Sequence, residues 1–374
     1  MDFRFTQEQD EAGELAAGLL RDRATNERMK AVEADGDRFD RDLWAALGEA
    51  GLLGLALPEE HDGAGLGLVE LCRVLVEVGR TVAPVPLAAH GPASRLLAEL
   101  GSEEQQQRWL SGAATGAVVL APAVAEERAW APARPTTTAT PEESAAGDAY
   151  RLTGSKAVVP AGPYADAFLV PAETPSGVGV FLVEPGDAGV TVVAQRSSDR
   201  DAVARLDLDG AVLGADRLVG PADGSADDRL RQLVLLAGAA EQLGITEGAL
   251  RLTSSYAKTR EQFGRPIGTF QAVSQRLADG YIDVLGQRLT LWQAAWRLEE
   301  GLPADTEVAI AKLWAADAGH RLAHTTVHVH GGVGIDLDGE AHRYFTSAKR
   351  FEFLHGGATE QALTIGRALA AEPA

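Results

Sequence analysis

The segment that decides the fold runs Tyr256-Ala-Lys-Thr-Arg-Glu-Gln-Phe-Gly-Arg-Pro-Ile-Gly268 and is followed by Phe270-Gln271-Ala272. It joins two long stretches of helical periodicity and carries side chains that suit a dinucleotide. Arg260 has a planar, permanently charged fork that matches a pyrophosphate, and Phe263 offers a flat apolar surface beside a ring system. Gln271 can donate to and accept from the edges of an adenine or a ribose. Taken singly, these residues also fit a salt bridge and ordinary core packing. The choice between dinucleotide binding and ordinary packing therefore depends on patterns elsewhere in the chain.

Helical and strand-forming patterns occupy separate regions around this segment. Apolar residues recur at helical spacing from residue 6 to 112 and again over long segments after residue 225. Between them, short β-rich runs separated by Gly, Pro and Asp predict a small β-barrel or sandwich. We therefore expect an α+β fold with three domains: an N-terminal α-helical domain (1–116), a middle β-barrel domain (117–225) and a C-terminal four-helix bundle (226–374). The expected bundle helices are residues 227–260, 268–300, 304–329 and 339–372, with Gly331-Gly332 and Gly356-Gly357 as interruptions.

One stretch of the middle region lacks any hydrophobic period. Residues 129–147 are rich in Ala, Pro, Thr and Glu. Such a composition is typical of a mobile surface loop, because it offers no apolar face to bury.

Charge and cysteine content exclude several classes of function. The 374 residues include 54 acidic and 34 basic side chains, which give a formal net charge of −20. A field of this sign repels nucleic acid and anionic membrane surfaces, so we expect neither as a partner. The single cysteine, Cys72, allows no internal disulfide. Because the sequence also lacks an export signal and an apolar run of the roughly 18 to 20 residues that a membrane span needs, we expect a cytoplasmic protein.

Four segments resemble segments of the acyl-CoA dehydrogenase family, and they occur along this chain in the family's order. They are the segment quoted above, Leu52-Leu-Gly-Leu-Ala-Leu-Pro58 through Gly67, Leu152-Thr-Gly-Ser-Lys156, and His328-Val-His-Gly-Gly-Val-Gly334. The resemblance implies FAD held across a subunit interface, an acyl-CoA thioester lying along the flavin, and a dimer or a dimer of dimers. The FAD-binding candidates that it implies are Arg260, Gln262, Phe263, Gln271, His328, Gly331 and Gly332. No metal site is predicted.

The family's reaction needs a base, and this chain departs from the family where that base should be. A carboxylate in a dry pocket suits the reaction, because burial raises its pKa toward that of the proton beside the thioester carbonyl. The resemblance places a glutamate at one of two positions. The first is the turn Leu354-His-Gly-Gly357, where His355 stands, and the second is Val234. The usual catalytic glutamate is thus missing from both.

Two side chains remain as possible substitutes for that base. His355 has an ordinary pKa of about 6.5 and can accept a proton, but an imidazolium is costly in an apolar pocket. Glu241 lies on roughly the same helix face as Val234, but about 10 Å further along, and it also fits a surface or interface position. The main-chain N–H of residue 355 can donate to a thioester oxygen whatever the side chain is.

Three functions stay open on these observations. The first is a subunit of a hetero-oligomeric acyl-CoA dehydrogenase, paired with a similar chain that carries the glutamate, as in actinobacterial enzymes that degrade bulky substrates such as steroid side chains. The second is a self-sufficient homo-oligomer that uses His355 or Glu241. The third is a non-redox acyl-binding or structural protein on the same scaffold.

Overall fold

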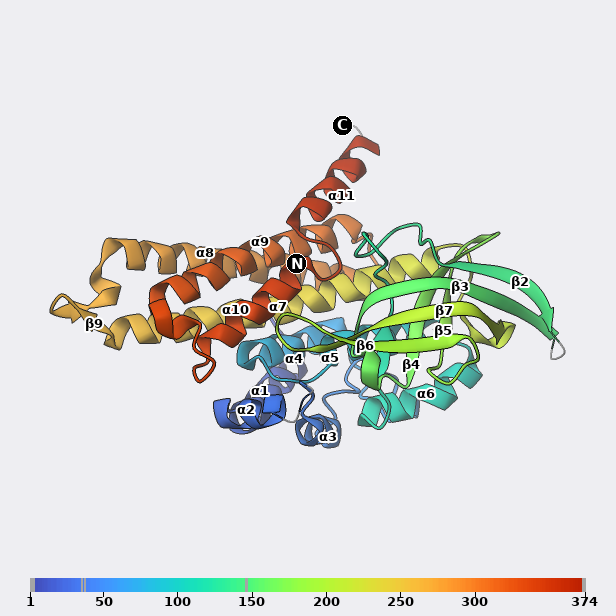
Figure 1. Cartoon of the computed structure of the whole chain (residues 1–374), viewed down its shortest axis with the longest axis horizontal. Coiled ribbons are helices and arrows are strands. Elements are labelled where there is room, and N and C mark those ends of the chain that lie inside the picture. Colours follow the sequence, from blue (N-terminus) through green and yellow to red (C-terminus); the bar gives the residue numbers. More distant parts are fainter. Residues whose placement is uncertain (1–3, 35, 37, 145–146, 372–374) are drawn as a thin grey trace. The chain divides into compact units, whose positions relative to one another are not determined.

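The computed structural model describes residues 4–34, 36, 38–144 and 147–371. Helices come first along the chain, then strands, then helices again (Figure 1), which confirms the predicted order. The chain divides into two compact units, one made of Met1–Ala34, Leu68–Pro84 and Gly238–Ala374 and the other of Asp35–Gly67 and Val85–Ala237. The three predicted domain boundaries stay predictions. The helices before the strands are α1 (Gln7–Arg23), α2 (Asn26–Ala34), α3 (Arg41–Glu49), α4 (Leu68–Thr81), α5 (Leu87–Leu100) and α6 (Glu103–Thr115).

The second unit holds a mixed sheet around an apolar core. Its strand order is β6-β7-β3-β2-β4-β5-β8, and β1 pairs in parallel with β4. Leu152, Phe168, Phe181 and Leu206 are fully buried in its core. The strands are β1 (Leu120–Pro122), β2 (Thr138–Ser144), β3 (Gly147–Pro160), β4 (Ala167–Thr174), β5 (Gly177–Val183), β6 (Val190–Arg196), β7 (Ala202–Gly214) and β8 (Leu218–Val219).

The prediction of a surface loop over residues 129–147 is wrong for the part that forms β2. This strand pairs antiparallel with β3, from Thr138 opposite Thr153 to Ser144 opposite Gly147. Its residues are poor strand formers, and the hydrogen bonds of a neighbouring strand outweigh that local preference. Residues 145–146 lie outside the described residues.

A buried ion pair joins two segments of this unit. The Nζ of Lys156 lies 2.7 Å from Oε1 of Glu126, and the two side chains are 0% and 3% exposed. The carboxylate also accepts hydrogen bonds from the N–H and hydroxyl groups of Thr136 and Thr137, at 2.6 to 3.0 Å. Burial by itself would raise the pKa of Glu126, but Lys156 and the threonines lower it to about 2. Glu126 is therefore an ionised and fully hydrogen-bonded carboxylate.

The first unit contains the C-terminal helices. A two-stranded hairpin, β9 (Glu261–Gln262) and β10 (Arg265–Pro266), connects the first two of them. The last predicted helix, residues 339–372, is divided into two, because the chain turns through positive φ at His355 (62°) and Gly356 (102°). The helices are α7 (Ser225–Thr259), of which this unit holds the part from Gly238, α8 (Gln271–Glu299), α9 (Asp305–His330), α10 (Ala341–Phe353) and α11 (Ala358–Ala371).

Helices α4 and α7 cross with their backbones in direct contact. A Cβ added at Gly244 would stand 1.9 Å from the carbonyl oxygen of Val76, and one added at Gly79 would stand 2.0 Å from that of Glu241. Only glycine permits so close an approach of two backbones. One turn further along α7, a Cβ at Gly248 would meet the carbonyl oxygen of Arg80 at 2.4 Å.

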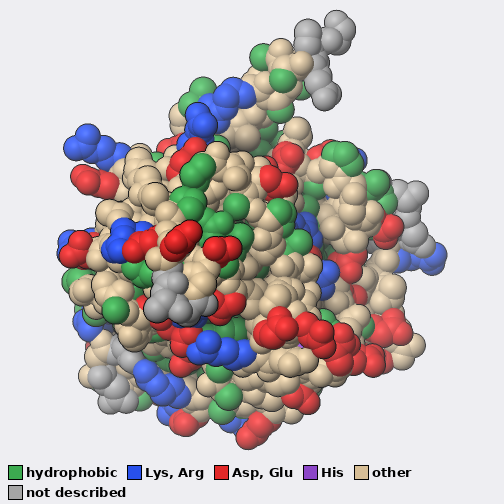
Figure 2. Space-filling model, turned by 90° about the vertical axis from the view of Figure 1, so that its right-hand side faces the viewer, with side chains coloured by type: hydrophobic (Ala, Val, Ile, Leu, Met, Phe, Trp, Pro, Cys, Tyr) green, Lys and Arg blue, Asp and Glu red, His purple; other side chains and the backbone are tan. Residues whose placement is uncertain are grey.

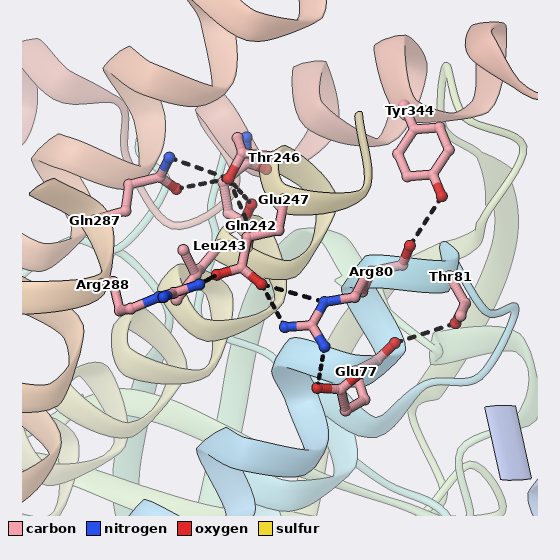
Figure 3. Close-up of polar contacts among 10 residues, drawn as sticks. All are labelled: Glu77, Arg80, Thr81, Gln242, Leu243, Thr246, Glu247, Gln287, Arg288 and Tyr344. Carbon is pink, nitrogen blue, oxygen red and sulfur yellow. Dashed lines mark hydrogen bonds and ion pairs between the residues drawn. The ribbon is translucent and has the colours of Figure 1, made fainter. Parts of the chain in front are cut away.

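A network of charged side chains surrounds this crossing (Figure 3). The guanidinium of Arg80 on α4 pairs with Glu77 on the same helix and with Glu247 on α7, and Glu247 also pairs with Arg288 on α8. The hydroxyl of Tyr344 on α10 donates to the carbonyl oxygen of Arg80 at 2.8 Å. Two acidic and two basic groups thereby join α4, α7 and α8, and the tyrosine hydroxyl adds α10.

One described helix, α7, is long and apolar enough to span a membrane by length and composition. Most of its apolar window is buried inside the structure, as in the core helix of a folded domain. On the surface, acidic side chains form the largest run of one charge on the face drawn in Figure 2. This agrees with the excess of acidic residues in the sequence.

Candidate active site

The predicted pyrophosphate residues lie on the hairpin between α7 and α8. The N–H of Arg260 continues α7 by donating to the carbonyl oxygen of Tyr256 at 2.8 Å, and the hairpin turns at Phe263 with φ 53°. The Phe263 ring is 93% exposed. Among the described residues, the exposed guanidinium of Arg260 makes no ion pair and no hydrogen bond. A charged fork and an aromatic face are thus both free for a ligand.

The start of α8 supports this hairpin. The guanidinium of Arg265 lies 4.3 Å from the ring centroid of Phe270, and the Phe263 ring meets the Phe270 ring edge to face at 6.1 Å. Gln271, the first residue of α8, is exposed beside them. The amide of Gln262 donates to the carbonyl oxygen of Glu261 at 2.8 Å.

The end of α9 packs against the end of α7. The rings of Tyr256 and His330 stack with centroids 4.3 Å apart and planes 22° apart. This stack, which sequence reasoning did not find, holds the end of α9, just before Gly331 and Gly332, against the last turns of α7. Gly331 has φ 65°, and a Cβ added at either glycine would meet nothing within 4 Å. His328 is exposed on the last turn of α9.

His355 occupies a buried turn between α10 and α11. It is 4% exposed, and its Nδ1 has no hydrogen-bond partner among the described residues. Its backbone N–H, in the part of the chain that the structure describes, also donates to no acceptor. An unpaired N–H inside a protein is rare and points to an acceptor from outside the chain.

The environment of His355 makes it a poor base. Burial, followed by the positive charges of Lys312 and Arg350, lowers the pKa of its imidazole to about 3. A group with this pKa stays neutral at pH 7 and holds an accepted proton too weakly for general base catalysis. This low pKa argues against His355 as the base, and a catalytic role for it stays a prediction.

Lys312 is a site residue that sequence reasoning missed. It lies on α9, is 1% exposed, and its Nζ donates to the carbonyl oxygens of Phe351 (2.7 Å) and Glu352 (3.3 Å). Burial lowers its pKa to about 7. The available signal was a lone charge in the apolar run Val308-Ala-Ile-Ala-Lys-Leu-Trp-Ala-Ala316.

The second base position and its substitute both lie on α7. Val234 is fully buried and offers no proton acceptor. Glu241 is 6% exposed, and its backbone faces Gly79 on α4. Its carboxylate is thus buried in the region of the helix crossing.

A polar cleft of about 410 Å³ also belongs to the first unit, but none of the predicted site residues line it. Arginines and glutamates share its walls, so no single ligand charge is favoured. Its lining is Arg21, Ala24, Thr25, Asn26, Glu27, Met29, Thr81, Val82, Arg251, Glu340, Arg343 and Tyr344. Among the described residues, no three His, Cys, Asp or Glu side chains gather as metal ligands would.

The residues on the hairpin and at the end of α9 fit a flavin dinucleotide. A free guanidinium suits a pyrophosphate, and the open backbone at Gly331 admits a ligand where a side chain would intrude. Comparison with known proteins adds the identity of the scaffold. The family model for the acyl-CoA dehydrogenase N-terminal domain matches residues 6–117, and the model for the acyl-CoA dehydrogenase C-terminal domain matches residues 236–370.

The chain belongs to the acyl-CoA dehydrogenase family, whose cofactor is FAD. It is 48% identical to acyl-CoA dehydrogenase FadE27 of Mycobacterium tuberculosis, over the full length of both chains. It is similar to a chain in the crystal structure of the ChsE4-ChsE5 complex from Mycobacterium tuberculosis, with a TM-score of 0.94, 48% identity and full coverage of both chains. A structure of a variant of the Tcur3481-Tcur3483 steroid ACAD gives a TM-score of 0.92 with 42% identity over 98% of each chain. The predicted family and fold are confirmed.

Proposed function

We propose that this chain is one subunit of a hetero-oligomeric acyl-CoA dehydrogenase that introduces a double bond between Cα and Cβ of an acyl-CoA thioester. The observation that carries the proposal is His355, a buried neutral imidazole with a pKa of about 3 at the position of the catalytic glutamate. A similar chain that carries the glutamate supplies the base. Two of the similar structures are themselves complexes of paired chains.

The chain's own residues hold the cofactor. Arg260 binds the pyrophosphate of FAD, Phe263 and Gln271 contact its rings, and the turn at Gly331 and Gly332 approaches it by backbone. When bound, FAD supplies the acceptor for the hydride that leaves Cβ. The thioester lies in the paired chain, whose carboxylate takes the α-proton and whose own backbone polarises the thioester oxygen as negative charge develops there.

The acyl group that we propose is bulky, of the steroid side-chain class. One similar structure is a steroid enzyme, which supports this class of acyl group. We place the protein in the cytoplasm. Its thiol at Cys72 is reduced and 1% exposed.

A self-sufficient enzyme is the alternative, because Glu241 is a buried carboxylate of this chain. Expression of the chain alone and together with a similar glutamate-bearing chain separates the two. We expect no thioester oxidation by the chain alone and oxidation by the pair. His355→Ala in the pair is expected to leave the rate within about threefold, since an imidazole with so low a pKa takes no proton. Oxidation by the chain alone, or its loss in an intact His355→Ala pair, would contradict the proposal.

Flavin retention tests the cofactor site directly. Arg260→Ala should weaken FAD binding by about 1.5–3 kcal/mol, because a charge-assisted contact to the pyrophosphate is lost. The flavin-to-protein absorbance ratio after gel filtration of the pair measures it. Arg367→Ala, at an exposed arginine of α11, is the matched control and should retain flavin. Equal flavin retention by both variants would show that the pyrophosphate site is not at Arg260.

A further inference from the structure

Helices α7 and α9 end beside each other and run in the same direction. The hydroxyl groups of Thr253 and Thr326 hydrogen-bond at 3.1 Å, and both side chains are fully buried. One turn further along each helix, the rings of Tyr256 and His330 stack with centroids 4.3 Å apart. Because residue numbers rise together along the two helices, the chain leaves both of them at the same end.

The hairpin that begins at Arg260 and closes at Ile267, here called the Arg260 hairpin, is attached to the end of α7. The carbonyl oxygen of Tyr256 accepts from the N–H of Arg260, and that of Arg260 accepts from the N–H of Ile267, both at 2.8 Å. Between these two bonds, Gln262 pairs with Arg265 across the two strands. The hairpin therefore keeps its place relative to the last turn of α7, on which Tyr256 lies.

The glycine turn, which runs from Gly331 to Gly334, is attached in a similar way to the end of α9. The N–H of Gly331 donates to the carbonyl oxygen of Val327. A Cβ added at Gly334 would stand 2.9 Å from that oxygen and 3.1 Å from the Cβ of His330, so the turn folds back onto the helix end. The Nδ1 of His330 lies 2.8 Å from the carbonyl oxygen of Thr326, to which it donates. The imidazole is thereby fixed against its own helix while it stacks on α7.

We propose that Tyr256 and His330 are positioning residues for FAD: their stack holds the Arg260 hairpin and the glycine turn in one arrangement, so that one dinucleotide can contact both. The proposal rests on the acyl-CoA dehydrogenase function and the FAD site given above. Holding two binding elements in place before the ligand arrives lowers the ordering cost of binding. The stack acts through these two elements and is assigned no contact with the cofactor.

The rate of FAD release from the holo pair measures the role of the stack. His330→Leu keeps an apolar side chain but removes the ring, and it should raise the release rate about twofold to tenfold, as for the loss of one aromatic pair. His330→Phe keeps a ring and loses the hydrogen bond to Thr326, so it should release FAD at close to the wild-type rate. The rise in flavin fluorescence after dilution gives both rates. A wild-type rate in His330→Leu, or equally fast release from both variants, would rule out the stack as the cause.

A double-mutant cycle separates positioning from general support of the fold. If the stack holds the Arg260 contact in place, His330→Leu should accelerate FAD release less than about half as much in an Arg260→Ala background, where that contact is already lost. Equal fold-changes in the two backgrounds would mean independent effects and would overturn the positioning role. Phe5→Leu is the matched control, because it removes another ring pair of the same unit, in which Phe5 meets Trp292 on α8 edge to face at 5.0 Å. It should release FAD at the wild-type rate, and release as fast as from His330→Leu would also count against the proposal.

Hydrogen exchange tests the stack independently of the cofactor contacts. In the co-expressed pair, His330→Leu should speed exchange at the N–H groups of Ile267 and Gly331 by about threefold or more, because both elements lose a common support. His330→Phe should exchange as wild type does, and Tyr256→Leu should match His330→Leu and replaces it if that variant does not fold. If the wild-type pair holds no FAD, the proposed cofactor site fails, while exchange still decides whether the stack fixes the two elements. Unchanged exchange at both residues would show that it does not.

Discussion

Replacing Gly244 by alanine is expected to lower the free energy of unfolding by at least about 3 kcal/mol, the upper range for overpacking a protein interior. The added Cβ would stand 1.9 Å from the carbonyl oxygen of Val76 and 2.6 Å from the N–H nitrogen of Arg80. Both neighbours are backbone atoms of α4, so no rotamer change can relieve the overlap. The two helices must separate, which would also stretch the contacts of Arg80 with Glu247.

Gly366→Ala provides the control for this substitution. Gly366 lies in the middle of α11, and a Cβ there would meet nothing within 4 Å. Because alanine is the better helix former, this variant should gain up to about 1 kcal/mol. Urea titration followed by circular dichroism measures both variants. A Gly244→Ala protein as stable as Gly366→Ala would show that α4 and α7 do not touch as described.

Lys156→Met should destabilise the sheet unit by about 3–5 kcal/mol, the usual cost of removing one partner from a buried ion pair. The carboxylate of Glu126, 3% exposed, would keep its four bonds from Thr136 and Thr137 but lose its counter-charge. Glu126 has its pKa held at about 2, below its ordinary 4.5. Its stabilising contribution is therefore present above pH 4.5 and is lost as the pH falls toward 2.

Arg151→Met is the matched comparison, since Arg151 pairs with Glu142 across β2 and β3 at the surface, with side chains 47% and 34% exposed. That pair should be worth less than about 1 kcal/mol. Thermal unfolding of both variants near pH 7 gives the comparison. Equal losses would mean that Lys156 and Glu126 are hydrated rather than buried.

The sequence predicted the parts of the fold that local patterns encode. Long amphipathic periods gave the helices after residue 225, and the glycines at 356 and 357 gave the break before α11. Short β-rich runs gave strands such as β4 and β5. These elements could be predicted because periodicity and turn preference depend on residues that are close together in the sequence.

The features that escaped prediction depend on distant partners. Strand β2 exists because β3 offers it a ladder of hydrogen bonds, although its own residues favour a loop. Lys312 contacts two carbonyl groups about forty positions away along the chain, and the pKa of His355 is lowered by its burial and then by Lys312 and Arg350. No local window of sequence contains these relations.

Part of the candidate site could be predicted from the sequence. The resemblance named the hairpin residues and the turn at His355, and their roles toward flavin and thioester stay predictions. The Tyr256–His330 stack, which brings the ends of α7 and α9 together, was not foreseen, because ring stacking between helices depends on their packing.

Burial of the chain's one cysteine has a practical use. Cys72 is 1% exposed, and burial raises the pKa of its thiol far above neutrality, so reagents that attack thiolates leave it intact. A cysteine introduced at an exposed position would then be the one reactive thiol of the molecule. A spin or fluorescent label attached there would report how near a second polypeptide comes, without any need to remove the native sulfur first.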